Sequence, residues 1–444
     1  MGSISNHYKA GYSNTVKAKF LIMIIGVMGT VGVGAQSLVE VLEQTLATNP
    51  NIQSTAYNVT AAEALRRQAA SGYLPSVDLF LARGLERSDN TTTRAAEDVN
   101  RQFDRFERSL TINQMLYDGF ATANFVRQQE AVLQATVSRL ISTQENTALG
   151  AAQAYLEVLK RERLVELANT NLKQHDETLV KIEERFESGV GTKVDVVQTK
   201  GRRAQSKSAL LLSEKDTENA RAGFYRVVGE SPRSLVLPKR PASLPDTLTE
   251  AVQLAFRENP QVKAAEEDIN ASRAARKQIL GGFQPRIDLA LGATRNDDMD
   301  GSPGANNDET AVLKMSYNLY RGGADRARVK EAVARINAAE QALVALRRSI
   351  TQDVSFLWND VEDLTLRIEY LQLHVTSTEE VLEVYLEQLA IGKRTLLDVL
   401  DIQNELFRAR SGLVSAEFQL RLAEYRLLAT GGQFLANFGL NTSP

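Results

Sequence analysis

Residues 75–81 read PSVDLFL and residues 285–291 read PRIDLAL. In both segments a proline precedes a stretch in which large apolar residues recur at every second position, a pattern typical of a β-strand with two different faces. The flanking sequence repeats as well, because residues 37–84 align with residues 247–294 without a gap. The chain is therefore a tandem duplication with a period of about 200 residues, too long for a solenoid repeat, so each copy is a structural half.

The composition excludes several classes of function. The 444 residues contain 52 Lys and Arg against 55 Asp and Glu, so we expect no nucleic-acid partner. The chain has no cysteine, which excludes disulfides, thiolate metal sites, thiol catalysis and a lipid-carrying N-terminal cysteine. No nucleophile–base arrangement or metal-ligand spacing stands out, and we expect no catalytic residues, no cofactor and no metal site.

The first 35 residues have the pattern of a secretory signal peptide. Three lysines, at positions 9, 17 and 19, precede an apolar run over residues 20–33, and small residues follow up to Ala35. The run is shorter than the roughly 20 residues of an ordinary membrane-spanning helix. We predict cleavage before Gln36, with an uncleaved anchor as the alternative.

Two long proline-free stretches predict long helices over about 121–187 and 322–390. In the second stretch, apolar residues recur at steps of three and four from Ile350 to Leu389, the period of a left-handed coiled coil. At about 1.5 Å per residue each helix would be roughly 100 Å long. A second helix follows each one, over about 192–228 and 395–429, so each half contains a helical hairpin.

The turns of these hairpins are expected at about 187–195 and 390–401. A glycine in each turn suits a left-handed helix end, and a Thr-x-x-Asp sequence matches a capping box for the next helix. These tip residues are Gly189, Thr192 and Asp195 in the first half and Gly392, Thr395 and Asp398 in the second.

Four short segments alternate between apolar and polar residues and predict strands over 76–86, 107–117, 286–294 and 310–320. Long polar loops are expected over 84–107 and 295–309. Either the strands form a small soluble sheet, or they cross a membrane with one face toward lipid. Four strands cannot close a barrel and an open edge is costly in lipid, so membrane strands would require several chains to share one barrel.

The expected organisation is two repeats with short connecting and terminal segments. We place the signal peptide at 1–35, the first repeat at 36–230, a proline-rich linker at 231–246, the second repeat at 247–432 and a C-terminal tail at 433–444.

The chain resembles the TolC-like outer-membrane efflux protein family over essentially the whole mature sequence. The motifs that carry the resemblance are the duplicated Asn-Pro at 49–50 and 259–260, the two Pro-x-[Val/Ile]-Asp-Leu strand entries, the Tyr-x-Gly strand exits, and GKRTLLDVLD at 392–401. Each motif is weak alone, whereas their order, duplication and spacing together are specific.

The resemblance implies a mainly α-helical protein with membrane β-structure. A homotrimer would contribute four strands per chain to a twelve-stranded β-barrel in the outer membrane of a Gram-negative bacterium, continued by a long coiled-coil α-helical barrel across the periplasm. The family passes proteins or small molecules outward from an inner-membrane ABC or proton-driven pump, through a periplasmic adaptor (membrane fusion) protein. The missing lipid-attachment cysteine and the plain tip motif favour the protein-exporting, type I secretion branch.

The resemblance also implies a gate at the periplasmic end. Arg394 matches the basic residue of a link, Asp195 matches its acidic partner, and Asp398 and Asp401 match rings of carboxylates. The tips around Gly189, Thr192, Gly392 and Thr395 would contact the adaptor. One departure is Leu389, which stands where relatives can have an aromatic residue that joins the link.

Two alternatives stay open. The capping boxes give Asp195 and Asp398 a purely structural role at helix N-termini, beside or instead of a gating role. A non-channel exported coiled-coil scaffold or adhesin is the alternative function, since its short hairpins would never enter a membrane.

Overall fold

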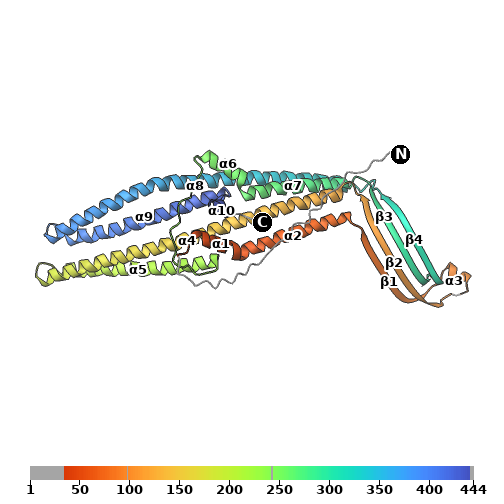
Figure 1. Cartoon of the computed structure of the whole chain (residues 1–444), viewed down its shortest axis with the longest axis horizontal. Helices are drawn as coiled ribbons and strands as arrows, with labels where there is room; N and C mark the ends of the chain where they lie inside the picture. Colours follow the sequence, from red (N-terminus) through yellow and green to blue (C-terminus); the bar gives the residue numbers. More distant parts are fainter. Residues whose placement is uncertain (1–34, 98, 242–243, 441–444) are drawn as a thin grey trace, which may run out of the picture.

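The computed structural model describes residues 35–97, 99–241 and 244–440. The predicted signal peptide, apart from Ala35, lies outside these residues. Figure 1 shows a long rod of helices that ends in hairpin tips on one side and in a curved sheet on the other.

Two long hairpins form the half of the rod that carries the tips. The helices α4 (Ala121–Glu187) and α8 (Ala324–Ala390) have 67 residues each, and they turn back into α5 (Lys193–Val228) and α9 (Leu396–Thr430). These bounds lie close to the predicted ranges. The buried side chains of α8 fall mainly on the predicted coiled-coil positions: Ile350, Val354, Leu364, Val375, Thr378 and Leu382.

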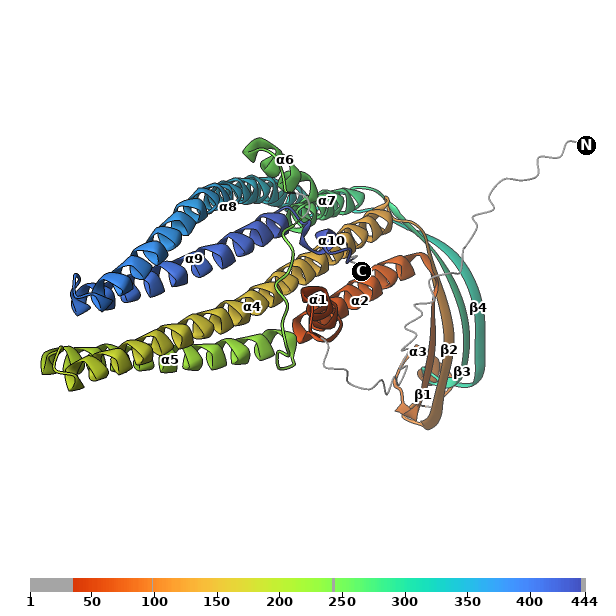
Figure 2. The same cartoon turned by 60° about the vertical axis from the view of Figure 1, so that its left-hand side comes forward.

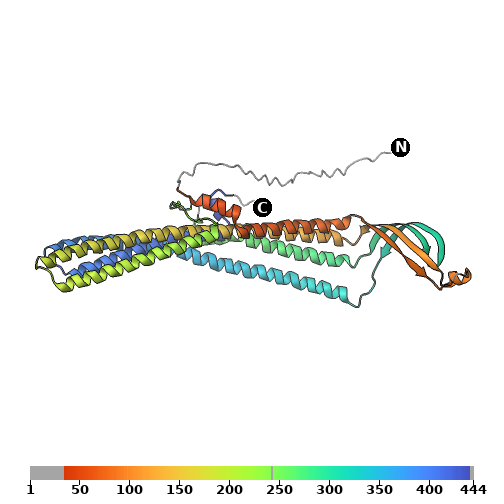
Figure 3. The same ribbon diagram turned by 90° about the horizontal axis from the view of Figure 1, so that it is seen from below.

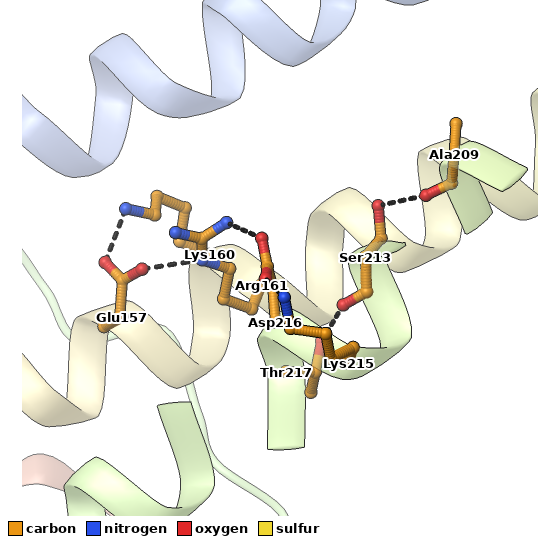
Figure 4. A network of polar contacts seen from close by, with 8 residues as sticks. All are labelled: Glu157, Lys160, Arg161, Ala209, Ser213, Lys215, Asp216 and Thr217. Carbon is orange, nitrogen blue, oxygen red and sulfur yellow. Dashed lines mark hydrogen bonds and ion pairs between the residues drawn. The ribbon is translucent and has the colours of Figure 1, made fainter. Parts of the chain in front are cut away.

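Ion pairs align the two helices of the first hairpin. The Arg161 guanidinium donates to Glu157 of its own helix at 2.7 Å and to Asp216 of α5 at 2.9 Å (Figure 4). Lys160 also pairs with Glu157. The pairs are partly exposed, so they contribute little stability but specify how α4 and α5 lie against each other.

Four shorter helices complete the rod: α1 (Leu38–Thr48), α2 (Pro50–Ala70), α6 (Leu248–Glu258) and α7 (Pro260–Gly281). In Figure 3, α2 continues the line of α5 toward the sheet, beside the uninterrupted α4. The helix α7 lies between α4 and α8 in the same half of the rod.

The duplicated Asn-Pro motif forms the joint between these helices. Asn49 accepts the Asn51 N–H at 3.0 Å as the N-cap of α2, while its amide donates to the Val227 carbonyl at the end of α5 at 3.0 Å. Asn259 repeats both bonds in the second half, to the Gln261 N–H at 2.8 Å and the Thr430 carbonyl at 2.9 Å. Each asparagine therefore starts one helix and holds the end of another.

The four strands form one antiparallel sheet in the order β1-β2-β3-β4. Their bounds are β1 Ser76–Arg87, β2 Gln102–Tyr117, β3 Arg286–Met299 and β4 Ser302–Ser316. Figure 2 shows the sheet curved along its length. The two repeats are joined through β2 and β3, and β1 and β4 each keep one edge without a strand partner in the described chain.

The register separates two faces of the sheet. Val77 lies opposite Ile112, which lies opposite Leu291, so apolar residues share one face. Asp78 and its partner Thr111 lie on the other face. This alternation confirms the prediction of strands with one apolar and one polar face.

The predicted strand bounds need correction. β2 begins at Gln102 and not at 107, β3 extends to Met299, and β4 covers Ser302–Ser316 instead of 310–320. The long loop predicted over 295–309 is wrong, because these polar residues continue the β3–β4 ladder to a tight turn. The ladder bonds join main-chain groups, so polar side chains do not interrupt it. The loop expected over 84–107 is shorter and contains the helix α3 (Thr91–Ala95).

The main core lies at the middle of the rod, where α1 and the short helix α10 (Phe434–Asn437) pack on α4, α5 and α9. Its largest buried side chains include Tyr155, Phe224, Tyr425 and Phe434. The Tyr155 hydroxyl donates to the Gln36 carbonyl at 2.8 Å and accepts the Val236 N–H at 2.9 Å. It thereby fixes the start of the first repeat and the linker to the core.

Candidate gate at the hairpin tips

The two hairpin tips end in the same way. Gly189 and Gly392 adopt left-handed conformations, with φ of 81° and 73°. The Val190 N–H then bonds to the Arg185 carbonyl at 3.0 Å, and the Lys393 N–H to the Gln388 carbonyl at 2.9 Å. Nothing lies within 4 Å of where a Cβ would stand on either glycine, so the backbone conformation alone requires glycine here.

Both predicted capping boxes are present. Thr192 accepts the Asp195 N–H at 3.2 Å, and the Asp195 carboxylate accepts the Thr192 N–H at 3.1 Å. Thr395 and Asp398 make the same reciprocal pair, both bonds at 3.3 Å. The structural role of both aspartates is therefore confirmed, and it leaves a gating role open.

Arg394 lies against its own hairpin. Its Nε is 3.6 Å from the Asp398 carboxylate, and its guanidinium lies 3.9 Å from the centre of the Tyr385 ring. Within the described chain Arg394 forms no ion pair with Asp195, so the link between them stays a prediction. Tyr385, one turn before Leu389, is the aromatic partner of Arg394. The sequence analysis considered an aromatic residue only at position 389 and missed this contact.

Asp398 remains ionised near neutral pH. The Thr395 hydroxyl donates to its carboxylate at 2.7 Å and holds its pKa below the ordinary value, and the nearby Arg394 charge acts in the same direction. The side chain is 39% exposed, so the negative charge is available to ions that approach the tip.

Asp401 has a partner that the sequence did not reveal. Arg202 on α5 donates to the Asp401 carboxylate on α9 at 2.6 Å, and so joins the two hairpins of one chain. The residues stand 199 positions apart, and no local pattern in a single sequence indicates such a pair. A second contact between the hairpins lies nearer the tips, where Arg185 donates to the Leu389 carbonyl at 2.9 Å.

An apolar cluster fills the space between the hairpins, and we call it the tip seam: Ile182, Val196, Leu396 and Leu400, with Leu179 and Leu389 partly buried against them. A buried hydrogen bond from the Gln403 amide to the Thr178 hydroxyl, at 3.0 Å, extends the contact along the rod. Leu389 therefore has a packing role at the position where an aromatic residue was considered.

Neither membrane-crossing helices nor metal-binding clusters occur in the described ranges. None of the helices there combines the length and apolar character needed to cross a membrane. The same residues contain no group of three or more His, Asp or Glu side chains placed to hold a metal ion.

Comparison with known proteins decides the family. The model of the family described as "Outer membrane efflux protein" matches residues 41–230 and 251–433, which are the two halves of the duplication. The chain belongs to this family. The resemblance to TolC-like proteins is thereby confirmed, and the members of the family are outer-membrane channels, not enzymes.

Individual relatives agree with this assignment. The outer membrane efflux protein BepC of Brucella suis biovar 1 is 27% identical over 329 residues, which cover 74% of this chain and 72% of BepC. The alkaline protease secretion protein AprF of Pseudomonas aeruginosa is 25% identical over 397 residues, 86% of this chain and 81% of AprF. Among solved structures, CusC superposes with a TM-score of 0.79 at 15% identity, covering 89% of this chain and 91% of CusC.

The efflux-protein family places the chain in the outer membrane of Gram-negative bacteria, extending into the periplasm. Its broad function is that of an efflux or secretion channel. This replaces the alternative of a non-channel scaffold or adhesin.

Proposed function

We propose that the chain, starting at Gln36 after signal cleavage, assembles into a homotrimeric conduit that takes substrate from an inner-membrane pump through a periplasmic adaptor. The observation that carries the trimer is the sheet itself. It has one apolar face and two free edges, on β1 and β4, and unpaired edge groups cost several kcal/mol each in lipid. Joining β4 of one protomer to β1 of the next removes every edge. The number three follows from the family.

Native mass spectrometry of protein extracted from outer membranes tests this assembly. We expect an assembly of three mature chains, each with an N-terminus at Gln36. A soluble monomer recovered from the periplasm would overturn the proposal. A trimer with another N-terminus would contradict only the cleavage site.

The tips form the proposed gate and adaptor-facing surface. Exposed apolar side chains surround both turns: Val190 and Val194 on the first hairpin and Ile391 on the second. Clustered apolar side chains that are exposed to water commonly mark a protein–protein contact. In a conduit that ends in the periplasm, an adaptor would cover them. A photo-crosslinker at Val194 should capture a periplasmic adaptor, while one at Tyr57, exposed on α2, should not.

The relatives support two classes of cargo. AprF, by its name, serves secretion of a protease, and BepC, by its name, serves efflux. We propose protein export through a type I system driven by an ABC pump as the first candidate, with small-molecule efflux as the second. A deletion strain separates them. Loss of proteins from the culture medium with unchanged sensitivity to toxic compounds supports the first, and the reverse pattern supports the second.

A further inference from the structure

The ion pair between Arg202 and Asp401 differs from its neighbours in what it joins. Arg203, the next residue, pairs with Asp176 of α4, inside the first hairpin. Arg410 pairs with Glu379 at 2.6 Å, inside the second. The pair of Arg202 instead crosses from the first hairpin to the second, beside the tip seam.

Asp401 is the acidic partner of Arg202, and the neighbouring groups do not compete for this pair. Buried His175 lies nearby on α4, and its pKa is lowered by burial and by the positive charge of Arg202. His175 is therefore neutral near pH 7 and offers no competing charge. Asp176, the acidic group near His175, is already paired with Arg203. The side chain of Arg202 is 28% exposed and that of Asp401 58%, so the carboxylate reaches further into solvent than its partner.

We infer that Arg202 sets the charge of the gate, because it neutralises Asp401 while the two hairpins of a protomer are in contact. This inference rests on the proposed function, in which the tips surround a conducting constriction. In the closed contact, the Asp398 carboxylate is ionised but lies 3.6 Å from the Arg394 Nε of its own hairpin, so both carboxylates of the second tip have a cation beside them. When the hairpins of a protomer part, the pair breaks and the Asp401 carboxylates are freed. The constriction therefore becomes more negative as it opens.

Single-channel recordings of the full protein in planar bilayers test the inference. The variants are Arg202→Gln, Asp401→Asn and the double variant, with Arg203→Gln as the matched control that removes the same charge one residue away. We expect Arg202→Gln to raise the cation preference and to lower the half-blocking Mg²⁺ concentration roughly threefold. Arg203→Gln should resemble the wild type. Arg202→Lys, which keeps the charge, should do so as well.

The double variant provides the sharpest comparison. Asp401→Asn should change selectivity little in the wild-type background, where Arg202 already neutralises the carboxylate, but should return the Arg202→Gln channel to wild-type behaviour. Equal effects of Arg202→Gln and Arg203→Gln would overturn the inference, as would an Asp401→Asn effect that is the same in both backgrounds. A wild-type protein that inserts without conducting would refute the channel itself. Native mass of each variant confirms that it assembles.

Discussion

Glu145 is a carboxyl group buried inside the middle of the rod. It lies on α4, is 3% exposed and accepts the Leu435 N–H at 3.3 Å, next to the start of α10. Burial raises its pKa to about 7, although bonds from the backbone of Leu435 and Phe434 act in the opposite direction. The group therefore links proton uptake to the docking of the C-terminal segment.

This carboxyl group should make the folded protein less stable as the pH rises. The pKa of Glu145 in the folded protein lies above its ordinary value of 4.5, so its contribution to stability is fully present below pH 4.5 and is lost as the pH rises through about 7. The loss is on the order of 3 kcal/mol. Thermal unfolding of Glu145→Gln between pH 5 and pH 8 should show a flatter dependence than the wild type. Glu130→Gln, at a half-exposed position on the same helix where the carboxylate pairs with Arg66, supplies the control. A Glu145→Gln profile that matches the control profile would contradict the assignment.

Asn49 and Asn259 make the same contacts in the two halves, so replacing either one should lower the free energy of unfolding by a similar amount. Asn259→Ala removes the N-cap of α7 and leaves the carbonyl of Thr430 without its amide donor, which should cost about 1–3 kcal/mol. Asn49→Ala should cost about as much, because its contacts are the same. Asn259→Asp separates the two bonds, since it keeps the acceptor and loses the donor. Urea unfolding of the purified protein measures all three, and an unchanged midpoint in Asn259→Asp would show that the Thr430 bond contributes nothing.

Two glycines bring a strand exit and a helix end together at the joint between sheet and rod. Gly119 follows β2 with φ of 67°, and a Cβ there would lie 2.5 Å from the Gly281 carbonyl oxygen. Gly281, at the end of α7, would in turn meet Ala121 and the Gly119 carbonyl at 2.9 Å. The equivalent of Gly119 in the second half is Gly322, with φ of 62° and nothing within 4 Å.

This difference predicts unequal effects of the same substitution. Gly322→Ala should cost about 1 kcal/mol from backbone strain alone. Gly119→Ala adds a clash with main-chain atoms that cannot move aside, so it should lower the stability by more. The amount of assembled protein in the outer membrane should fall as well. Yield of trimer on seminative gels compares the two variants directly. Equal yields would mean that the joint adapts to the added methyl group.

The success of sequence reasoning differed between kinds of element. Helices such as α8 were predictable because a 3.5-residue period and an absence of proline leave few other structures. The outer parts of β3 and β4 were missed because Asn and Asp side chains usually mark loops, while the ladder depends on main-chain groups. Arg202 and Tyr385 could not be found, since their contacts depend on how the hairpins lie against each other and on which turn faces Arg394.

At the scale of the whole molecule, the β3–β4 turn of the sheet and the hairpin tips should lie on opposite sides of the outer membrane. The absence of native cysteine makes this directly testable, because any introduced cysteine is the only thiol in the chain. Pro303→Cys, beside the β3–β4 turn, should react with a membrane-impermeant maleimide on intact cells. Lys193→Cys, at the first tip, should react only after the outer membrane is permeabilised. The cysteine-free wild type is the control, and the opposite labelling pattern would invert the topology.

The sheet order β1-β2-β3-β4 has a consequence for the history of the chain. β2 of the first repeat meets β3 of the second inside one chain, just as β4 would meet β1 of the next protomer. A ring of half-length ancestors could therefore have preceded the duplication, with gene fusion turning every second subunit boundary into an internal one. Identical half-length subunits must carry identical charges. After fusion the copies could diverge, and where the first repeat now has Arg202 the second has Glu405. After such a fusion, the two hairpins alternate around the ring, and the charges of each can evolve separately.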